Sequence, residues 1–269
     1  MVRDEAYSTE QIQAALQNAD QCMRMIILLL SSTGARIGSM PGLVLRNLVK
    51  LPDYGLYRIT FYEGTNHDYY SFVTKECATT GIDTYLQYRQ RCGEKISFNK
   101  DTQRWEPGDV PLIRQQFDAN DILQVRFPRP VILNTLRKAL EAHLIKCGIR
   151  QVEHPIASDT NPNHSAKRIR KTISLTTGFR KHVISTFIEA ELNHEIRELL
   201  VDHATQLDQN YFRPTQDQVL AEYLKAEPLL TMEPSMRLQK EVETLRVEKN
   251  SWEALREEVN SLKELLKQG

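Results

Sequence analysis

The segment from Met23 to Leu30 is the feature that most constrains the fold of this chain. It reads Met-Arg-Met-Ile-Ile-Leu-Leu-Leu, so a helix here would be apolar on nearly every side. Such a helix must be surrounded by other elements. It is far shorter than the run of about 20 apolar residues that spans a membrane, and Ser31 to Gly34 supply a stop signal directly after it. The chain must therefore build a helical body around this segment.

The remaining patterns predict more helices and one β-hairpin. Ser8 and Gln11 have the spacing of a capping box at the start of a first helix. Residues alternate in polarity between Leu56 and Thr74 around a glycine-containing turn, which predicts two strands. A short helix is expected after Gly34, and residues 93–130 have the composition of an irregular connection with a short helix near Asn120. Further helices are expected at 75–91, 131–147, 178–191, 193–201 and 217–226. The predicted fold class is mainly α with a small β-sheet (α+β).

Composition excludes several classes of protein. The chain has 35 basic and 35 acidic residues, which argues against a uniformly basic nucleic-acid-binding surface, so any site for a polyanion must be local. The first residues are polar and do not resemble a signal peptide, and we expect a cytoplasmic protein without a membrane segment. The four cysteines are far apart and the histidines lack metal-ligand spacing. We therefore expect no disulfide, metal or cofactor.

One segment is strongly basic. Residues 161–182 contain no acidic residue. They contain the basic residues Lys167, Arg168, Arg170, Lys171, Arg180 and Lys181. Cationic side chains of this kind bind phosphates and release condensed counterions. This segment is therefore the one strongly basic patch of an otherwise neutral chain, and it is where a site for a polyanion is expected.

Four short motifs occur in the order found in the tyrosine recombinases and integrases. Ser-Thr-Gly-Ala-Arg-Ile-Gly at 32–38 resembles their first arginine motif, and Gly-Phe-Arg-Lys at 178–181 resembles the second. Leu-Leu-Val-Asp-His at 199–203 and Asn-Tyr-Phe-Arg-Pro at 210–214 are similar to their Leu-Leu-Gly-His and nucleophile segments. The resemblance covers roughly residues 8–230. The sequences around Phe179 and Tyr211, and Tyr-Leu-Lys-Ala at 223–226, are similar to those of archaeal and archaeal-virus integrases in particular.

The resemblance implies a catalytic domain at 1–230 and a role for each motif residue. Arg36 and Arg180 would hold the scissile phosphate, since planar guanidinium groups bind phosphate oxygens in pairs. Tyr211 would be the nucleophile and form a 3′-phosphotyrosyl bond, releasing a 5′ hydroxyl. His203 would donate a hydrogen bond to the phosphate or manage protons. The resemblance also implies double-stranded DNA as the partner, with Lys167, Arg168, Arg170, Lys171 and Lys181 on its backbone. The reaction would need no metal, and recombination would need four protomers on two DNA duplexes.

The sequence departs from the family pattern at three places. Thr177 stands where the family has a histidine or basic residue, three positions before the second arginine. The hairpin turn, Glu63 to Asp68, has no lysine to act as general acid, and either His67 or Lys75 is a candidate replacement. A missing general acid slows such a step by about 10² to 10⁴. The front DNA-binding domain typical of the family is also expected to be absent.

The C-terminal segment, residues 231–269, has a heptad pattern. Apolar side chains recur every seven residues at Leu238, Leu245, Trp252, Val259 and Leu266. A second seam of Val242, Leu255 and Leu262 is interrupted by Lys249 and Arg256. Heptads of this kind predict a coiled coil. A short dimer and a helix that folds back on the body both remain possible.

The function predicted from these features is site-specific cutting and rejoining of duplex DNA. The departures at Thr177 and in the hairpin turn leave an alternative, a catalytically weakened relative that binds DNA and regulates recombination. A third possibility is the relaxation of supercoils by the same nicking and rejoining chemistry. Tyr223 is a rival nucleophile, but its apolar neighbours favour a packing role.

Overall fold

The computed structural model describes residues 5–151, 173–202 and 213–238, together with six positions in the C-terminal segment. These positions are Val242, Leu245, Arg246, Lys249, Trp252 and Arg256. The chain divides into two compact units, residues 1–232 and residues 233–269.

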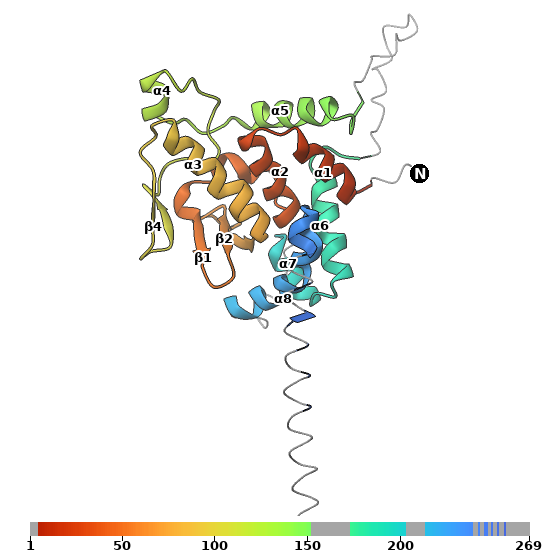
Figure 1. Ribbon diagram of the computed structural model, residues 1–269. Coiled ribbons are helices and arrows are strands. Elements are labelled where there is room, and N and C mark those ends of the chain that lie inside the picture. Colours follow the sequence, from red (N-terminus) through yellow and green to blue (C-terminus); the bar gives the residue numbers. More distant parts are fainter. Residues whose placement is uncertain are drawn as a thin grey trace, which may run out of the picture. The chain divides into compact units, whose positions relative to one another are not determined.

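Helix α2 (Gln21–Thr33) is the centre of the first unit, as the apolar segment predicted. Every residue from Met25 to Thr33 is buried. The helix packs against α1 (Thr9–Gln17), α3 (Thr84–Arg91), α6 (Thr177–Glu189) and α8 (Gln216–Leu230), which surround it in Figure 1. Its all-round apolar surface requires this enclosure, because each exposed face would leave large aliphatic side chains in water.

The ends of the first two helices follow the sequence signals. Ser8 caps α1, and Ser8 and Gln11 form the predicted capping box. Gly34 ends α2 in the left-handed conformation, with a φ of 61°. A Cβ added at Gly34 would lie 3.2 Å from the Val183 side chain of α6. Glycine is therefore needed here both for the backbone conformation and for the close approach of α6.

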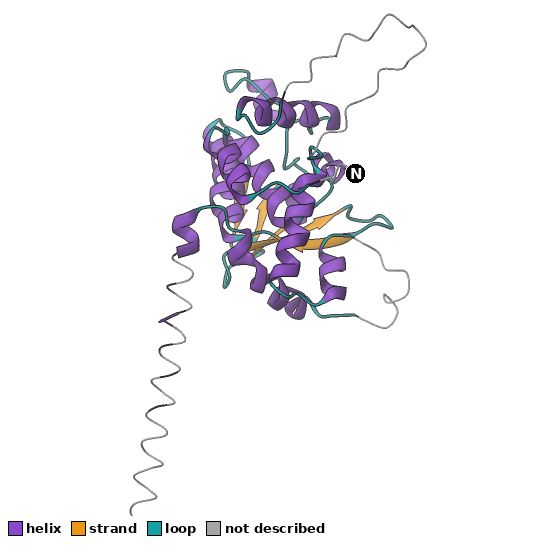
Figure 2. Ribbon diagram, turned by 90° about the vertical axis from the view of Figure 1, so that its right-hand side faces the viewer, coloured by secondary structure: helices purple, strands orange, loops and turns teal. Residues whose placement is uncertain are grey.

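The sheet contains one more strand than the sequence predicted. The predicted hairpin is β2 (Leu56–Phe61) paired with β3 (Tyr69–Phe72). A preceding strand, β1 (Leu48–Leu51), pairs with β2 to give an antiparallel sheet in the order β1-β2-β3. Figure 2 shows the sheet among the helices of the first unit. Four residues give too little alternation for the sequence to reveal β1.

Two of the predicted α-helices, the one after Gly34 and the one at 75–91, consist partly or wholly of other helix types. The helix after Gly34 is a pair of 3-10 turns, η1 (Ile37–Gly42) and η2 (Leu45–Asn47), and the helix at 75–91 is a π-helical segment η3 (Cys77–Asp83) followed by α3. The prediction of an irregular connection at 93–130 is wrong in one respect, because it contains a second hairpin of β4 (Ser97–Asn99) and β5 (Arg104–Glu106). Strands of three residues carry no readable period. The expected helices α4 (Ile122–Arg126) and α5 (Leu133–Lys146) follow.

The last helices of the first unit form a second apolar cluster against the sheet. Helix α7 (His194–Leu200) begins at the predicted cap Asn193 and packs near β3. Tyr223 of α8 is fully buried, and its hydroxyl donates to the Ser32 carbonyl oxygen at 3.2 Å. The predicted packing role of Tyr223 is confirmed.

The heptad positions that the structure describes in the second unit are exposed. Leu238, Val242, Leu245 and Trp252 are at least 46% exposed, and all four are helical. The coiled coil predicted from their heptad spacing stays a prediction. Among the described residues of the whole chain, no helix is long and apolar enough to cross a bilayer.

Candidate functional site

Two of the four predicted catalytic residues, Arg36 and Arg180, belong to the described part of the chain. His203 and Tyr211 lie outside the described residues. Among the predicted DNA-binding residues, Lys181 is described and half-buried on α6. Lys167, Arg168, Arg170 and Lys171 lie outside the described residues. The described part of the predicted site therefore consists of Arg36, Arg180 and the residues around them.

Arg36 follows the glycine that ends α2, and its side chain is 50% exposed. One terminal nitrogen forms an ion pair with the Asp202 carboxylate. The other terminal nitrogen donates to the Asp202 carbonyl oxygen at 3.3 Å. Asp202 thus engages both terminal nitrogens of the Arg36 guanidinium and supplies a compensating negative charge.

Arg180 lies on the first turns of α6 and is only 9% exposed. Its guanidinium donates to the Gly34 carbonyl oxygen at 2.8 Å and to the Val201 carbonyl oxygen. Burial lowers the pKa of the Arg180 guanidinium, and the nearby charge of Arg36 lowers it further. An arginine nevertheless remains charged at neutral pH.

The two arginines converge on one short stretch of chain. Arg180 holds Val201 and Arg36 holds Asp202, consecutive residues just after α7. A guanidinium has five N–H donors, and each arginine has donors left beyond those used here. Both guanidiniums thus reach the same two residues, and the planar fork of an arginine is the side-chain geometry that matches phosphate oxygens.

Two side chains that the sequence analysis did not assign belong to this site. Asp202 was part of a quoted motif, but its pairing with Arg36 depends on tertiary structure. Tyr69 at the start of β3 has a buried hydroxyl without a hydrogen-bond partner among the described residues. The charges of Arg180, Asp202 and Arg36 all act on this phenol.

The hairpin turn between β2 and β3 is tied to η2. Glu63 accepts hydrogen bonds from Arg46 Nε and Asn47 Nδ2, both at 2.9 Å. His67 is exposed in this turn. Thr177, the other departure from the family pattern, is exposed at the first position of α6.

The structure places the second candidate for the missing lysine at the wrong end of the hairpin. The Lys75 side chain lies beside Gly55, with its Cε 3.7 Å from the position of an added Gly55 Cβ. Gly55 precedes β2, whereas the turn follows the end of β2 at Phe61. The proposal that Lys75 replaces the lysine of the turn is therefore wrong, because β2 separates the two.

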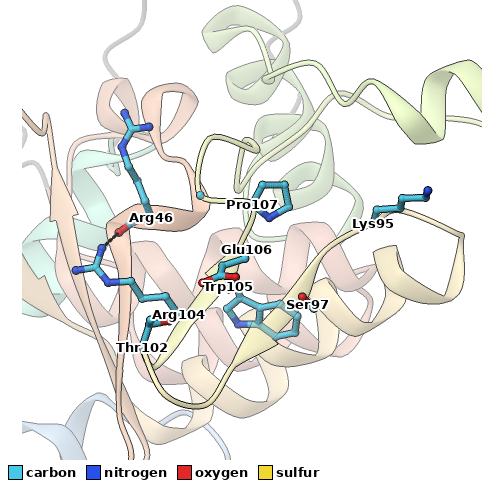
Figure 3. A pocket seen from close by; sticks show the side chains of 9 residues that line it. Arg46, Lys95, Ser97, Thr102, Arg104, Trp105, Glu106 and Pro107 are labelled. Carbon is cyan, nitrogen blue, oxygen red and sulfur yellow. Dashed lines mark hydrogen bonds between the residues drawn. The ribbon is translucent and has the colours of Figure 1, made fainter.

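A hollow of about 600 Å³ lies on another part of the first unit. It is lined by basic and aromatic side chains around the β4–β5 hairpin, including Arg46, Lys95, Arg104 and Trp105. Figure 3 shows Arg104 donating to the Arg46 carbonyl oxygen, at 3.1 Å. The Arg46 guanidinium is paired with Glu63 and Asp109. This hollow shares no residue with the arginine pair, and its central cation is already neutralised.

Asp202→Asn is expected to strengthen binding to duplex DNA. The substitution removes the negative charge beside Arg36, and asparagine tolerates the left-handed conformation of residue 202, where φ is 54°. We expect a two- to tenfold lower dissociation constant, because an exposed ion pair that competes with DNA for Arg36 is lost. The salt dependence of binding should become steeper by about one counterion. Fluorescence anisotropy at several salt concentrations measures both.

A matched control separates this effect from net charge. Asp53 is exposed in the β1–β2 turn, at the far end of the sheet from the β2–β3 turn, and Asp53→Asn changes the net charge by the same amount. Equal tightening by both variants would contradict a specific competition between Asp202 and DNA phosphate for Arg36.

Comparisons with known proteins give the fold a name. No family model matches the sequence, and no curated protein matches it. Among solved structures, the crystal structure of XerA recombinase superimposes with a TM-score of 0.50 at 15% identity, covering 83% of this chain and 64% of XerA. The XerH site-specific recombinase bound to its difH substrate, before and after cleavage, gives TM-scores of 0.44 and 0.46 at 11% and 12% identity. These two comparisons cover 76% of this chain and 48% of XerH.

The similarity to XerA shows a shared fold. This chain spans somewhat less than two thirds of the XerA chain and about half of XerH. The fold predicted from the motifs, mainly helical with a small sheet and similar to a recombinase, is therefore confirmed at that level.

Proposed function

We propose that this protein is a site-specific tyrosine recombinase that cuts and rejoins duplex DNA in the integration or excision of a mobile element. The observation that carries the proposal is the convergence of Arg36 and Arg180 on residues 201 and 202. The recombinase-like fold supports it. The two arginines come from motifs far apart in the sequence, and both bind the chain directly before His203.

The proposed chemistry follows from the charge of the site. Arg36 and Arg180 bind the non-bridging oxygens of one DNA phosphate and stabilise the charge that develops during attack. The Tyr211 hydroxyl loses its proton and its oxygen forms a bond to phosphorus, while the bond from phosphorus to the 5′ oxygen breaks and that 5′ oxygen takes up a proton. His203 donates a hydrogen bond to the phosphate or moves a proton. Attack by a 5′ hydroxyl reverses these steps, so rejoining requires no metal, cofactor or nucleotide.

The DNA backbone is proposed to run from this site along the basic segment. Lys167, Arg168, Arg170 and Lys171 would neutralise neighbouring phosphates, and Lys181 on α6 lies one residue from Arg180. With double-stranded DNA as its proposed partner, the protein is also proposed to act in the cytoplasm, at the nucleoid.

A suicide substrate tests the proposal. The substrate is a nicked duplex whose short fragment diffuses away after cleavage, so that the enzyme remains attached. We expect the wild-type protein to give a covalent protein–DNA band, with the adduct on the peptide that contains Tyr211. Tyr211→Phe should abolish the band, and Tyr223→Phe should retain it because that phenol is buried and bonded to Ser32. A band that persists in Tyr211→Phe would remove Tyr211 from its role.

Assembly on DNA is proposed to involve several copies of the chain. Recombination by this chemistry exchanges strands of two duplexes, and four protomers would supply the four nucleophiles. The exposed heptad residues Leu238, Val242, Leu245 and Trp252 support dimerisation through the C-terminal segment. Two chains that pack these side chains together would remove them from water.

A second candidate function is regulation of recombination by DNA binding without cleavage. The Asp202 carboxylate neutralises Arg36, and the lysine absent from the hairpin turn is not replaced by Lys75. Tight DNA binding by the wild-type protein without any covalent product on nicked substrates would favour this function over the first.

A further inference from the structure

Tyr69 is held rigidly at the end of the hairpin turn. It is the first residue of β3 and pairs with Phe61, the last residue of β2. Its ring stacks on the Phe61 ring, with centroids 5.0 Å apart and an angle of 19° between the planes. A stacked ring in a strand has little freedom to rotate, so the direction of its hydroxyl is fixed by the sheet.

The hydroxyl of Tyr69 is buried and makes no hydrogen bond among the described residues. A buried polar group without a partner loses its hydration and gains nothing in return. Such groups are rare in folded proteins and often belong to a binding or catalytic site. The hydroxyl therefore has no visible role in holding the fold together.

The packing of β3 places Tyr69 beside the arginine site. Helix α7 packs on β3 and ends at Leu200, directly before the two residues that Arg180 and Arg36 bind. Burial raises the pKa of the phenol, and Arg180, Asp202 and Arg36 are among the charged groups that influence it. Tyr62 of the adjacent turn is the remaining contributor. A phenol with a raised pKa keeps its proton at neutral pH, so it can donate a hydrogen bond but is a poor nucleophile.

We propose that the Tyr69 hydroxyl is a third phosphate ligand, donating a hydrogen bond to the DNA phosphate held by Arg36 and Arg180. The inference rests on the proposed function and adds a residue to its site. No proton is transferred by Tyr69; the hydroxyl stays neutral and gains in the transition state the partner it lacks in the free protein. It supplies a donor directly beside a turn that has no lysine.

Tyr69→Phe tests the proposal, because it is expected to lower the rate of adduct formation without lowering the free energy of unfolding. The rate of covalent adduct formation on the nicked duplex should fall by about 10- to 100-fold, which corresponds to the loss of one hydrogen bond to a charged group. The free energy of unfolding should stay the same or rise, because the lost hydroxyl had no partner. A lower stability together with an unchanged rate would overturn the proposal and give the hydroxyl a structural role.

Tyr223→Phe is the matched control. It also removes one buried hydroxyl, but this one donates to the Ser32 carbonyl oxygen. We expect Tyr223→Phe to lower the stability against urea and to leave the rate of adduct formation unchanged in the folded protein. If the two variants slow adduct formation equally, the effect is not specific to Tyr69 and the proposal fails.

A measurement with inorganic phosphate does not depend on the nucleophile. Phosphate that binds the folded protein stabilises it by RT ln(1 + c/Kd) at a phosphate concentration c, so the rise in melting temperature with phosphate concentration gives the dissociation constant. We expect a several-fold weaker dissociation constant for phosphate in Tyr69→Phe than in the wild type. An equal constant, or no stabilisation of the wild type by phosphate, would overturn the role of Tyr69. Failure of the wild type to form any adduct on DNA would instead overturn the proposed function, and the phosphate measurement would still decide on Tyr69.

Discussion

Arg180→Lys is expected to slow DNA cleavage by about 10² to 10³, the usual effect of removing one donor that stabilises developing charge. Lysine keeps the positive charge but has no planar fork. It cannot donate to the Gly34 and Val201 carbonyl oxygens and also present further N–H groups to a phosphate. DNA affinity at equilibrium should change much less than the rate, because the charge is retained. Single-turnover cleavage and anisotropy measure the two quantities.

Arg150→Lys is the control for the structural part of this effect. Arg150 is also 9% exposed and donates to the Tyr7 hydroxyl at 3.0 Å and to the Ile173 carbonyl oxygen at 2.8 Å. Both variants lose buried hydrogen bonds, and each should lower the free energy of unfolding by about 1 to 3 kcal/mol. Only Arg180→Lys should slow cleavage in the folded protein. Equal rates for the two variants would contradict a role for Arg180 at the phosphate.

The sequence predicted the parts of the fold that have a long and unambiguous pattern. The apolar surface of α2 required burial, and the cap at Ser8 and the stop at Gly34 placed the helix ends correctly. Strands β1, β4 and β5 were not predicted, because segments of three or four residues depend on pairing with distant residues rather than on their own period.

The candidate site was only partly visible in the sequence. No local pattern brings Arg36 beside Arg180, and only the resemblance to a family suggested that they meet. The pairing of Asp202 with Arg36, and the position of Tyr69 on a strand that packs against α7, depend on tertiary structure alone. Asp202 adopts a left-handed conformation after α7. Its carboxylate pairs there with Arg36, which follows α2 and is distant in the sequence.

A buried network of three charges gives the largest expected effect on stability. Glu94 lies between Arg89 and Arg114, and all three side chains are at most 3% exposed. The Glu94 carboxylate accepts from Arg89 Nε at 3.0 Å and from Arg114 at 2.6 Å. Arg89 also donates to the carbonyl oxygens of Pro111 and Leu112, both at 2.9 Å. The network thus ties the end of α3 to the chain segment that follows β5.

Glu94→Gln is expected to lower the free energy of unfolding by about 3 to 5 kcal/mol. The amide fills the same space, but it leaves two buried guanidiniums without a counter-charge, and one of its former acceptor atoms becomes a donor that faces them. For a unit of this size each kcal/mol corresponds to about 2 to 4 °C in the melting temperature. Urea unfolding followed by circular dichroism measures the change.

Asp109→Asn is the control for charge itself, because Asp109 forms an ion pair with Arg46 in which its side chain is 89% exposed. Water screens that pair, so its loss should leave the stability unchanged within error. If Glu94→Gln were equally harmless, water or a shift of Arg114 would have to compensate for the lost charge, and the network would not fix the position of the segment after β5. A large difference between the two variants instead shows that burial, and not the number of ion pairs, decides how much a charge contributes to this fold.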